Sequence, residues 1–157
     1  MKKLIALALA SVCVLALAGC NDTKEEQIAT YSFRGENEYF AIANGSIVLS
    51  DTEEVFDGGD LEITQVDPFE EVASYSVTFY TLRDGERRII LSNSVIDQTG
   101  GSVNVNGDLG RAAGDGIIVG DKAETIDELR ENLWFELKTT NLSGTENTYQ
   151  VQLTLTE

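Results

Sequence analysis

The stretch "SVTFYTLRDGERRIILS", residues 76–92, holds two runs of apolar and β-branched side chains on either side of an Asp-Gly pair. Because Asp-Gly between such runs is typical of a two-residue hairpin turn, we expect Asp84 and Gly85 to form the turn. The predicted cross-strand pairs are Arg83 with Glu86, Tyr80 with Ile89, and Phe79 with Ile90. Apolar groups then lie on both faces, as in an interior strand pair of a two-sheet sandwich or at a covered edge.

A second hairpin is predicted in "YFAIANGSIVLS", residues 39–50. Asn44 and Gly45 match the central residues of a type I′ turn, which requires positive φ at both positions. The expected pairs are Ala43 with Ser46, Ile42 with Ile47, and Phe40 with Leu49. One face of this hairpin would then be wholly apolar.

The C-terminal third predicts two more strands and one helix. Apolar and polar residues alternate over 133–138 and 149–155, which indicates two strands joined through "NLSGTEN". The segment "DKAETIDELREN", residues 121–132, predicts a short helix in which Thr125 and Glu128 match a capping box. Its apolar face would consist of Ile126, Leu129 and Leu133.

The predicted fold class is all-β. About six to eight strands with one minor helix fit an antiparallel sandwich of broadly immunoglobulin-like kind, and a small closed β-barrel is the alternative. Pro68 falls in a predicted loop between strands. Residues 100–120 carry seven of the fourteen glycines, so we expect hairpin ends, bulges or a loop there.

Residues 1–20 have the layout of a targeting segment. Two lysines precede an uncharged run over residues 4–18, which is typical of a secretory signal and short for a membrane span. Ala16, Leu17 and Ala18 would suit an ordinary secretory cleavage, whereas Leu17-Ala18-Gly19-Cys20 resembles the lipobox of bacterial lipoproteins. We expect a lipoprotein signal peptide at 1–19, a lipidated N-terminus and flexible tether at 20–29, and a single sandwich domain at 30–157.

The lipobox resemblance implies that Cys20 carries the lipid. In that family a diacylglyceryl group is attached to the cysteine sulfur, and the signal peptidase then cleaves before this residue. Two acyl chains on one residue are enough for a stable anchor, whereas one is marginal. We therefore expect a protein of the cell membrane that faces outside the cytoplasm, on a tether that reaches roughly 30 Å at about 3.3 Å per residue.

Composition excludes several classes of function. The formal net charge is −16 at pH 7, which argues against nucleic-acid binding because that requires clustered Lys and Arg. The chain has no histidine, so the commonest general base and transition-metal ligand is missing. Its two cysteines, Cys13 and Cys20, leave none for a disulfide within the mature domain or a thiolate cluster. No cofactor is expected.

One series has the spacing of metal ligands. Asn104, Asn106 and Asp108 place oxygen-bearing side chains at alternate positions, as at the start of an EF-hand loop. Leu109 stands where that pattern requires glycine, and no glutamate follows at the required offset, so we expect no metal here. The acidic segments "DGGD" (57–60) and "DPFEE" (67–71) favour turns.

The functional hypothesis is a non-enzymatic binding module for an envelope or extracellular protein or glycan. One alternative is a carbohydrate-active hydrolase using Asp and Glu, which requires a carboxyl of raised pKa in a cleft. Another is an inhibitor or immunity-type protein, which an exposed apolar patch would favour. The aromatic residues are expected mainly in the core, with a sugar platform as the alternative; they are Tyr31, Tyr39, Tyr80 and Trp134.

The stretch "YSFRGENEYFAIANGSIVL", residues 31–49, resembles the opening strands of small uncharacterised lipoproteins of Gram-positive bacteria. The likeness rests on Phe33, Gly35, Glu36, Tyr39 and Phe40. Those proteins usually have a tryptophan near the position of Tyr39 or Phe40, and this chain departs from them there. The resemblance implies an exported β-sandwich and adds no catalytic residue.

Overall fold

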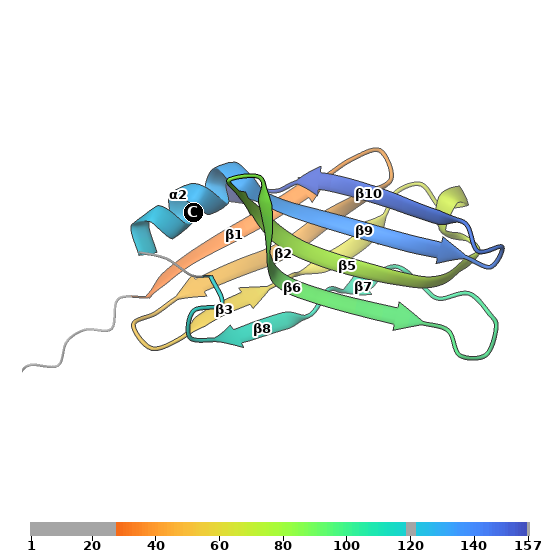
Figure 1. The fold of residues 1–157 in the computed structure, drawn as a ribbon, viewed down its shortest axis with the longest axis horizontal. Helices are drawn as coiled ribbons and strands as arrows, with labels where there is room; N and C mark the ends of the chain where they lie inside the picture. Colours follow the sequence, from red (N-terminus) through yellow and green to blue (C-terminus); the bar gives the residue numbers. More distant parts are fainter. Residues whose placement is uncertain (1–27, 119–121, 157) are drawn as a thin grey trace, which may run out of the picture.

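The computed structural model describes residues 28–118 and 122–156, which fold into two antiparallel sheets packed face to face (Figure 1). The larger sheet consists of β1 (Ala29–Glu36), β2 (Phe40–Leu49), β3 (Glu54–Asp57), β4 (Asp60–Ile63), β7 (Gly107–Asp108), β8 (Arg111–Gly114) and β11 (Thr154–Thr156). The smaller sheet consists of β5 (Val72–Arg83), β6 (Glu86–Ile96), β9 (Leu133–Asn141) and β10 (Glu146–Gln152). A 3₁₀ turn, η1 (Asp67–Phe69), contains Pro68 and precedes β5.

The expected all-β sandwich is confirmed, because the strands form two separate sheets rather than one closed sheet. The larger sheet runs in the order β11-β1-β2-β3-β8 with β4 and β7 beside it, and the smaller in the order β10-β9-β5-β6. The structure has more strands than predicted because two extended segments are each divided into two strands. β3 and β4 both pair with β2 and are separated by Gly58 and Gly59, and β10 and β11 are separated by Leu153. Among the described residues no helix combines the length and apolar character needed to cross a bilayer.

The hairpin over residues 76–92 is confirmed, with one correction. Arg83 pairs with Glu86, and positive φ angles of 52° at Asp84 and 81° at Gly85 form the turn between them. Tyr80 lies opposite Ile89 as predicted, but Phe79 lies opposite Leu91. An irregularity at Ile90 shifts the register by one residue, so the predicted pairing of Phe79 with Ile90 is wrong.

The predicted turn at Asn44-Gly45 is wrong, because β2 continues through these residues without reversing direction. Asn44 has the expected positive φ, 60°, but it lies where the pairing with β1 shifts register, in a bulge. The ring of Phe33 occupies the space beside Gly45: a Cβ on this glycine would lie 2.1 Å from Cε2 of Phe33. Glycine is therefore needed here for close packing rather than for chain reversal.

The "DGGD" segment is likewise not a turn. β3 and β4 pair with β2 in a single register on either side of Gly58 and Gly59. Gly59 has a φ of +71°, and a Cβ there would meet the carbonyl oxygen of Ala43 at 2.1 Å. The two glycines thus interrupt one extended path opposite the bulge in β2.

The C-terminal predictions hold in part, because the strand predicted over residues 149–155 is divided at Leu153 into β10 and β11, which belong to different sheets. β9 and β10 pair through the predicted loop, and helix α2 (Lys122–Asn132) precedes β9. Ile126 and Leu129 form the buried face of the helix, at 7% and 1% exposed, whereas Leu133, which was predicted to share that face, is the first residue of β9 and is 0% exposed. Because α2 begins at Lys122, Thr125 lies inside the helix, and the predicted capping box is wrong.

Five buried phenylalanines join the two sheets. Phe33 and Phe56 of the larger sheet stack at 5.1 Å between ring centroids, and Phe79 of the smaller sheet lies 5.1 Å from Phe56. Phe135 continues the series at 5.0 Å from Phe79 and 5.6 Å from Phe40. Each buried ring stabilises the fold by about 1.5–3 kcal/mol. The core therefore fixes both sheets and leaves their outer faces to solvent.

Candidate functional site

The outer face of the four-stranded sheet carries the candidate site. Along β9, Leu133, Phe135 and Leu137 are fully buried against the other sheet, so Trp134 and Glu136 point outward. The register aligns the outward residues of all four strands in rows. One row consists of Gln150, Glu136, Thr78 and Ser92.

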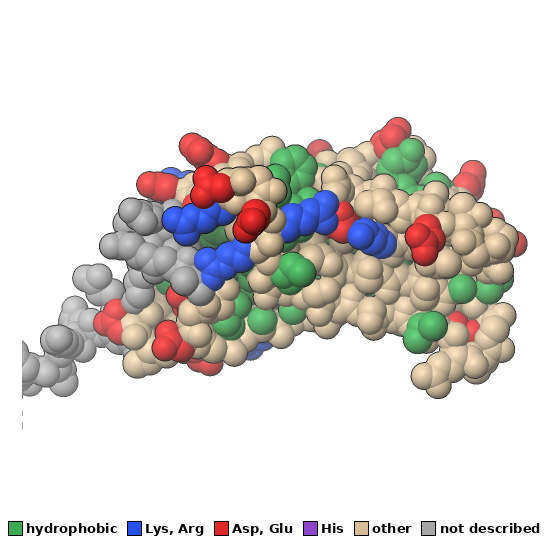
Figure 2. Space-filling model, viewed as in Figure 1, with side chains coloured by type: hydrophobic (Ala, Val, Ile, Leu, Met, Phe, Trp, Pro, Cys, Tyr) green, Lys and Arg blue, Asp and Glu red, His purple; other side chains and the backbone are tan. Residues whose placement is uncertain are grey.

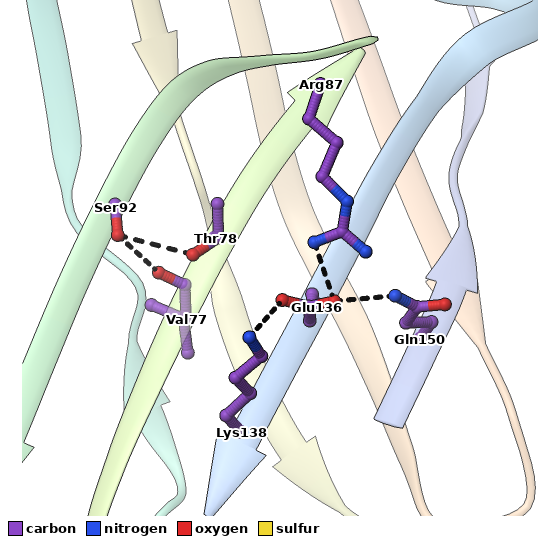
Figure 3. Close-up of polar contacts among 7 residues, drawn as sticks. All are labelled: Val77, Thr78, Arg87, Ser92, Glu136, Lys138 and Gln150. Atoms are coloured by element: carbon purple, nitrogen blue, oxygen red, sulfur yellow. Dashed lines mark hydrogen bonds and ion pairs between the residues drawn. The ribbon is translucent and has the colours of Figure 1, made fainter. Parts of the chain in front are cut away.

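Glu136 forms the centre of a polar cluster on this face (Figure 3). Arg87 Nη1 lies 2.8 Å from its Oε2, and the Nζ of Lys138 lies 3.3 Å from its Oε1. Gln150 donates a hydrogen bond of 2.6 Å from Nε2 to Oε2. The carboxylate is only 4% exposed although it faces outward, because these longer side chains from β6, β9 and β10 cover it.

The cluster keeps Glu136 ionised. Burial raises the pKa of this carboxyl, but hydrogen bonds from Gln150, Arg87 and Lys138 lower it by more, so the pKa lies below its ordinary value. Lys138 and Arg87 keep side-chain exposures of 58% and 44%, and their charges reach solvent. Two cations around one anion leave this part of the face with a positive charge in an acidic chain.

Arg87 also covers an aromatic side chain. Its guanidinium carbon lies 4.4 Å from the ring centroid of Tyr80, within the range of a cation–π contact. Tyr80 is 2% exposed and pairs across strands with Trp134, which is half-buried. Burial raises the pKa of the Tyr80 hydroxyl. The Arg87 guanidinium thus contacts both the Glu136 carboxylate and the Tyr80 ring.

Beyond Lys138 the same face forms a hollow of about 390 Å³. Short hydroxyl side chains line much of it, and Lys138, Glu146 and Ile96 stand around them. The serine and threonine residues of the lining are Ser74, Ser76, Ser94, Thr140 and Thr148, together with the buried Thr139. Because these side chains are short, the sheet surface lies low between the longer ones. Figure 2 shows the face, with Lys and Arg in a row, an acidic side chain to their right and a mostly uncharged area around it.

A wider hollow of about 710 Å³ lies on the outer face of the other sheet. Ala41 and Ala43 on β2 leave it shallow, and Arg34 and Glu36 of β1 border it. Ile42, which is apolar, is the one buried side chain in its lining, whereas the Glu136 face holds a buried carboxylate. The Glu136 face therefore has the better-organised polar groups.

The calcium candidates serve the local backbone. Asn106 Oδ1 accepts a hydrogen bond of 2.7 Å from the Ile63 amide, and Asn104 Oδ1 accepts one of 3.0 Å from the Asn106 amide. Asp108 Oδ1 accepts one of 2.7 Å from the Gly110 amide. The side chains thus stabilise the approach to β7 and β8. Across residues 28–118 and 122–156, no group of three or more acidic, His or Cys side chains is arranged to hold a metal.

The candidate aromatics do not gather into one platform. Tyr39 packs against Tyr149 at 5.0 Å, and Tyr31 packs beside the core. Trp134 was expected in the core, and this expectation is wrong: Trp134 lies on the outer face of β9 beside Tyr80. The site therefore has one half-buried indole with Tyr80 as its cross-strand neighbour, and Tyr31 and Tyr39 lie on other strands or loops.

The carboxyl groups bear on the hydrolase alternative. Asp97 and Glu136 have clearly shifted carboxyl pKa values, and both pKa values are lowered. For Asp97 the largest cause is the backbone hydrogen bond from Gly101. Neither group is prepared to be the protonated acid that a glycosidase requires.

Sequence reasoning missed the Glu136 cluster. Trp134, Glu136 and Lys138 shared a predicted face, and this alternation was the available signal. Arg87 could not be assigned to it, because the pairing of β9 with β5 is not encoded by any local pattern. Gln150 lies on the strand that was predicted to follow β9 through the NLSGTEN loop, but the register of that pair was not predicted. The predicted lipid site, Cys20, lies outside the described residues.

No model of a known protein family matches the chain, and neither curated protein sequences nor solved structures give a significant match.

Proposed function

We propose that the chain is a lipid-anchored extracytoplasmic binding module whose four-stranded face takes a hydroxyl-rich glycan of the envelope. The observation that carries this proposal is the hydroxyl-lined hollow beside the Glu136 cluster. Serine and threonine hydroxyls both donate and accept hydrogen bonds, as sugar hydroxyls do. A surface of such groups therefore complements a polyol better than it complements an apolar partner.

The length of the face suits a chain rather than a single sugar. From Trp134 to Thr140 along β9 the outward side chains span roughly 20 Å at about 3.4 Å per residue. Trp134 offers a half-buried ring at one end, Lys138 a cation in the middle, and the hollow lies at the other end. Several consecutive sugar units could lie along this track.

The Glu136 cluster supports binding by limiting motion before the ligand arrives. Lys138 and Arg87 are each tied to the carboxylate, so part of the entropy cost of ordering them is already met in the free protein. Their remaining exposure leaves donors for an anionic or hydroxyl group of the ligand.

The arrangement of the strands is compatible with an anchor at Cys20. β1 begins at one end of the sandwich, where α2 also lies, whereas the hollow lies near the start of β5 and the end of β9, at the opposite end (Figure 1). A tether of nine residues before β1 would leave the hollow open to the outside.

The binding face is tested with one substitution on each sheet. Ser76→Glu places a carboxylate in the hollow on β5, and Ser46→Glu places the same group on the outer face of β2. Cosedimentation of the protein with isolated cell-wall glycan should be lost for Ser76→Glu and retained for Ser46→Glu. Equal behaviour of the two variants would remove this face from the proposal, and failure of the unmodified chain to cosediment would remove the glycan.

The anchor is tested separately, in a bacterium that processes lipoproteins. An alkyne-bearing palmitate analogue should label the unmodified chain, and the chain should remain with the membrane fraction. Cys20→Ala should abolish the label and release the protein. Unlabelled, released wild-type protein would refute the anchor while leaving the glycan test intact.

A further inference from the structure

β6 is the long free edge of the smaller sheet. It has eleven residues and pairs only with β5, at the end of the strand order. In the described part of the chain, the other terminal strands are shorter: β10 has seven residues and begins with Glu146, β8 has four, β11 has three and β7 has two. Short or charged edges resist pairing with another chain, whereas a long neutral edge invites it.

The direction of the backbone groups along β6 follows from its pairing with β5. The Asp97 amide donates to the Ala73 carbonyl at 2.9 Å, so Asp97 is bonded toward β5. In an antiparallel ladder, alternate residues direct their N–H and C=O to opposite sides. The groups of Ser92, Ser94 and Ile96 therefore point away from β5, toward the open edge.

This half of β6 is exposed along the edge that faces away from β5, and of its side chains Asn93 donates a hydrogen bond of 2.8 Å to the Leu109 carbonyl. Each residue from Ser92 to Ile96 is exposed, including Val95 at 41% and Ile96 at 68%. No charged residue occurs between Arg88 and Asp97, in a chain whose net charge is −16. The edge is thus a stretch where a second copy meets no like charge.

We propose that two copies of this chain pair through antiparallel β6 strands about a two-fold axis near Ser92. The run begins after Arg87 and Arg88 and ends at Asp97, so an antiparallel pairing centred on Ser92 brings the basic end of each strand beside the acidic end of the other. The two four-stranded sheets would form one continuous sheet of eight strands.

The pairing would join the two candidate binding faces. Ser94 and Ile96 line the hollow, so the partner's β6 would border the open side of each hollow. A two-fold axis perpendicular to the sheet keeps both outer faces on one side of the dimer. A glycan could then contact two hollows at once, with the gain in avidity that linked sites provide.

Sedimentation velocity of the full chain in detergent tests the pairing. The unmodified chain should form a dimer. Ser94→Pro removes an N–H that points to the open edge and should raise the dimer dissociation constant at least about tenfold, whereas Ser94→Ala should not. A wild-type chain that stays monomeric would overturn the proposal.

A second pair of variants guards against a folding defect in Ser94→Pro. Ile96→Lys puts a charge on the edge, and Val66→Lys puts the same charge at an equally exposed apolar position away from it, where Val66 is 61% exposed. Of these two lysine variants, only Ile96→Lys should give monomers. Dimers that survive Ile96→Lys, or that are lost equally in Val66→Lys, would exclude the β6 edge as the interface.

Discussion

Replacing Glu136 with Gln should destabilise the fold by about 1.5–3 kcal/mol, the range for hydrogen bonds to charged groups. The carboxylate accepts from Arg87, Lys138 and Gln150, and an amide at this position turns its NH₂ group toward one of these donors. The loss should stay below the roughly 3–5 kcal/mol of a fully buried broken pair, because both cations reach water. Urea unfolding at neutral pH measures it as a shifted midpoint with an unchanged slope.

The same variant should show a diminishing effect in acid. Since the pKa of Glu136 is lowered on folding, the unfolded chain binds the proton more readily, and the carboxylate stabilises the fold above the unfolded value of about 4.3. That contribution is lost as pH falls through the lower folded pKa. The difference in unfolding free energy between wild type and Glu136→Gln should therefore be full above about pH 5 and shrink below about pH 4.

Glu146→Gln is the matched control, since Glu146 lies on the same face in β10 but is exposed. Its effect should stay within about 0.5 kcal/mol. If Glu136→Gln were as mild as this control, or if its cost were constant from neutral pH to acid, the carboxylate would not be the group that holds the cluster together.

Three further predictions concern the fold around the site. Gly45→Ala should cost about 1–3 kcal/mol in urea unfolding, because its Cβ would overlap the ring of Phe33, and Phe33→Leu should make the same change less costly. Thr139→Val should raise the unfolding free energy by about 1 kcal/mol, since the buried Oγ1 has no hydrogen-bond partner; a lower melting midpoint would contradict this. Asn106→Ala should cost about 1 kcal/mol by removing the acceptor of the Ile63 amide, and added calcium should leave the melting midpoint of the wild type unchanged; a rise with calcium would restore the metal site.

The predicted hairpins show how far local patterns reach. Asp84-Gly85 forms its turn because the flanking strands pair with each other, and the register is correct as far as Tyr80. Asn44-Gly45 has the same local chemistry, but β2 passes through it because β1, β3 and β4 pair along its whole length. The Asn-Gly pair correctly predicts the positive φ of Asn44, whereas pairing with the neighbouring strands determines whether the chain reverses direction there.

The candidate site shows the same limit. Alternation along β9 predicts that Glu136 shares a face with Trp134 and Lys138. It does not predict burial, because the covering side chain of Arg87 comes from a strand that is not adjacent to β9 in the sheet.

The amino-acid sequence alone determined the fold class, the β5–β6 turn, the buried face of α2 and the inward and outward sets of β9, because each follows from the period of apolar residues within one segment. Only the tertiary structure decided the order of the strands, the bulge at Asn44, and the meeting of Glu136 with Arg87. These features depend on contacts between segments far apart in the chain, and the packing of the two sheets selects among them.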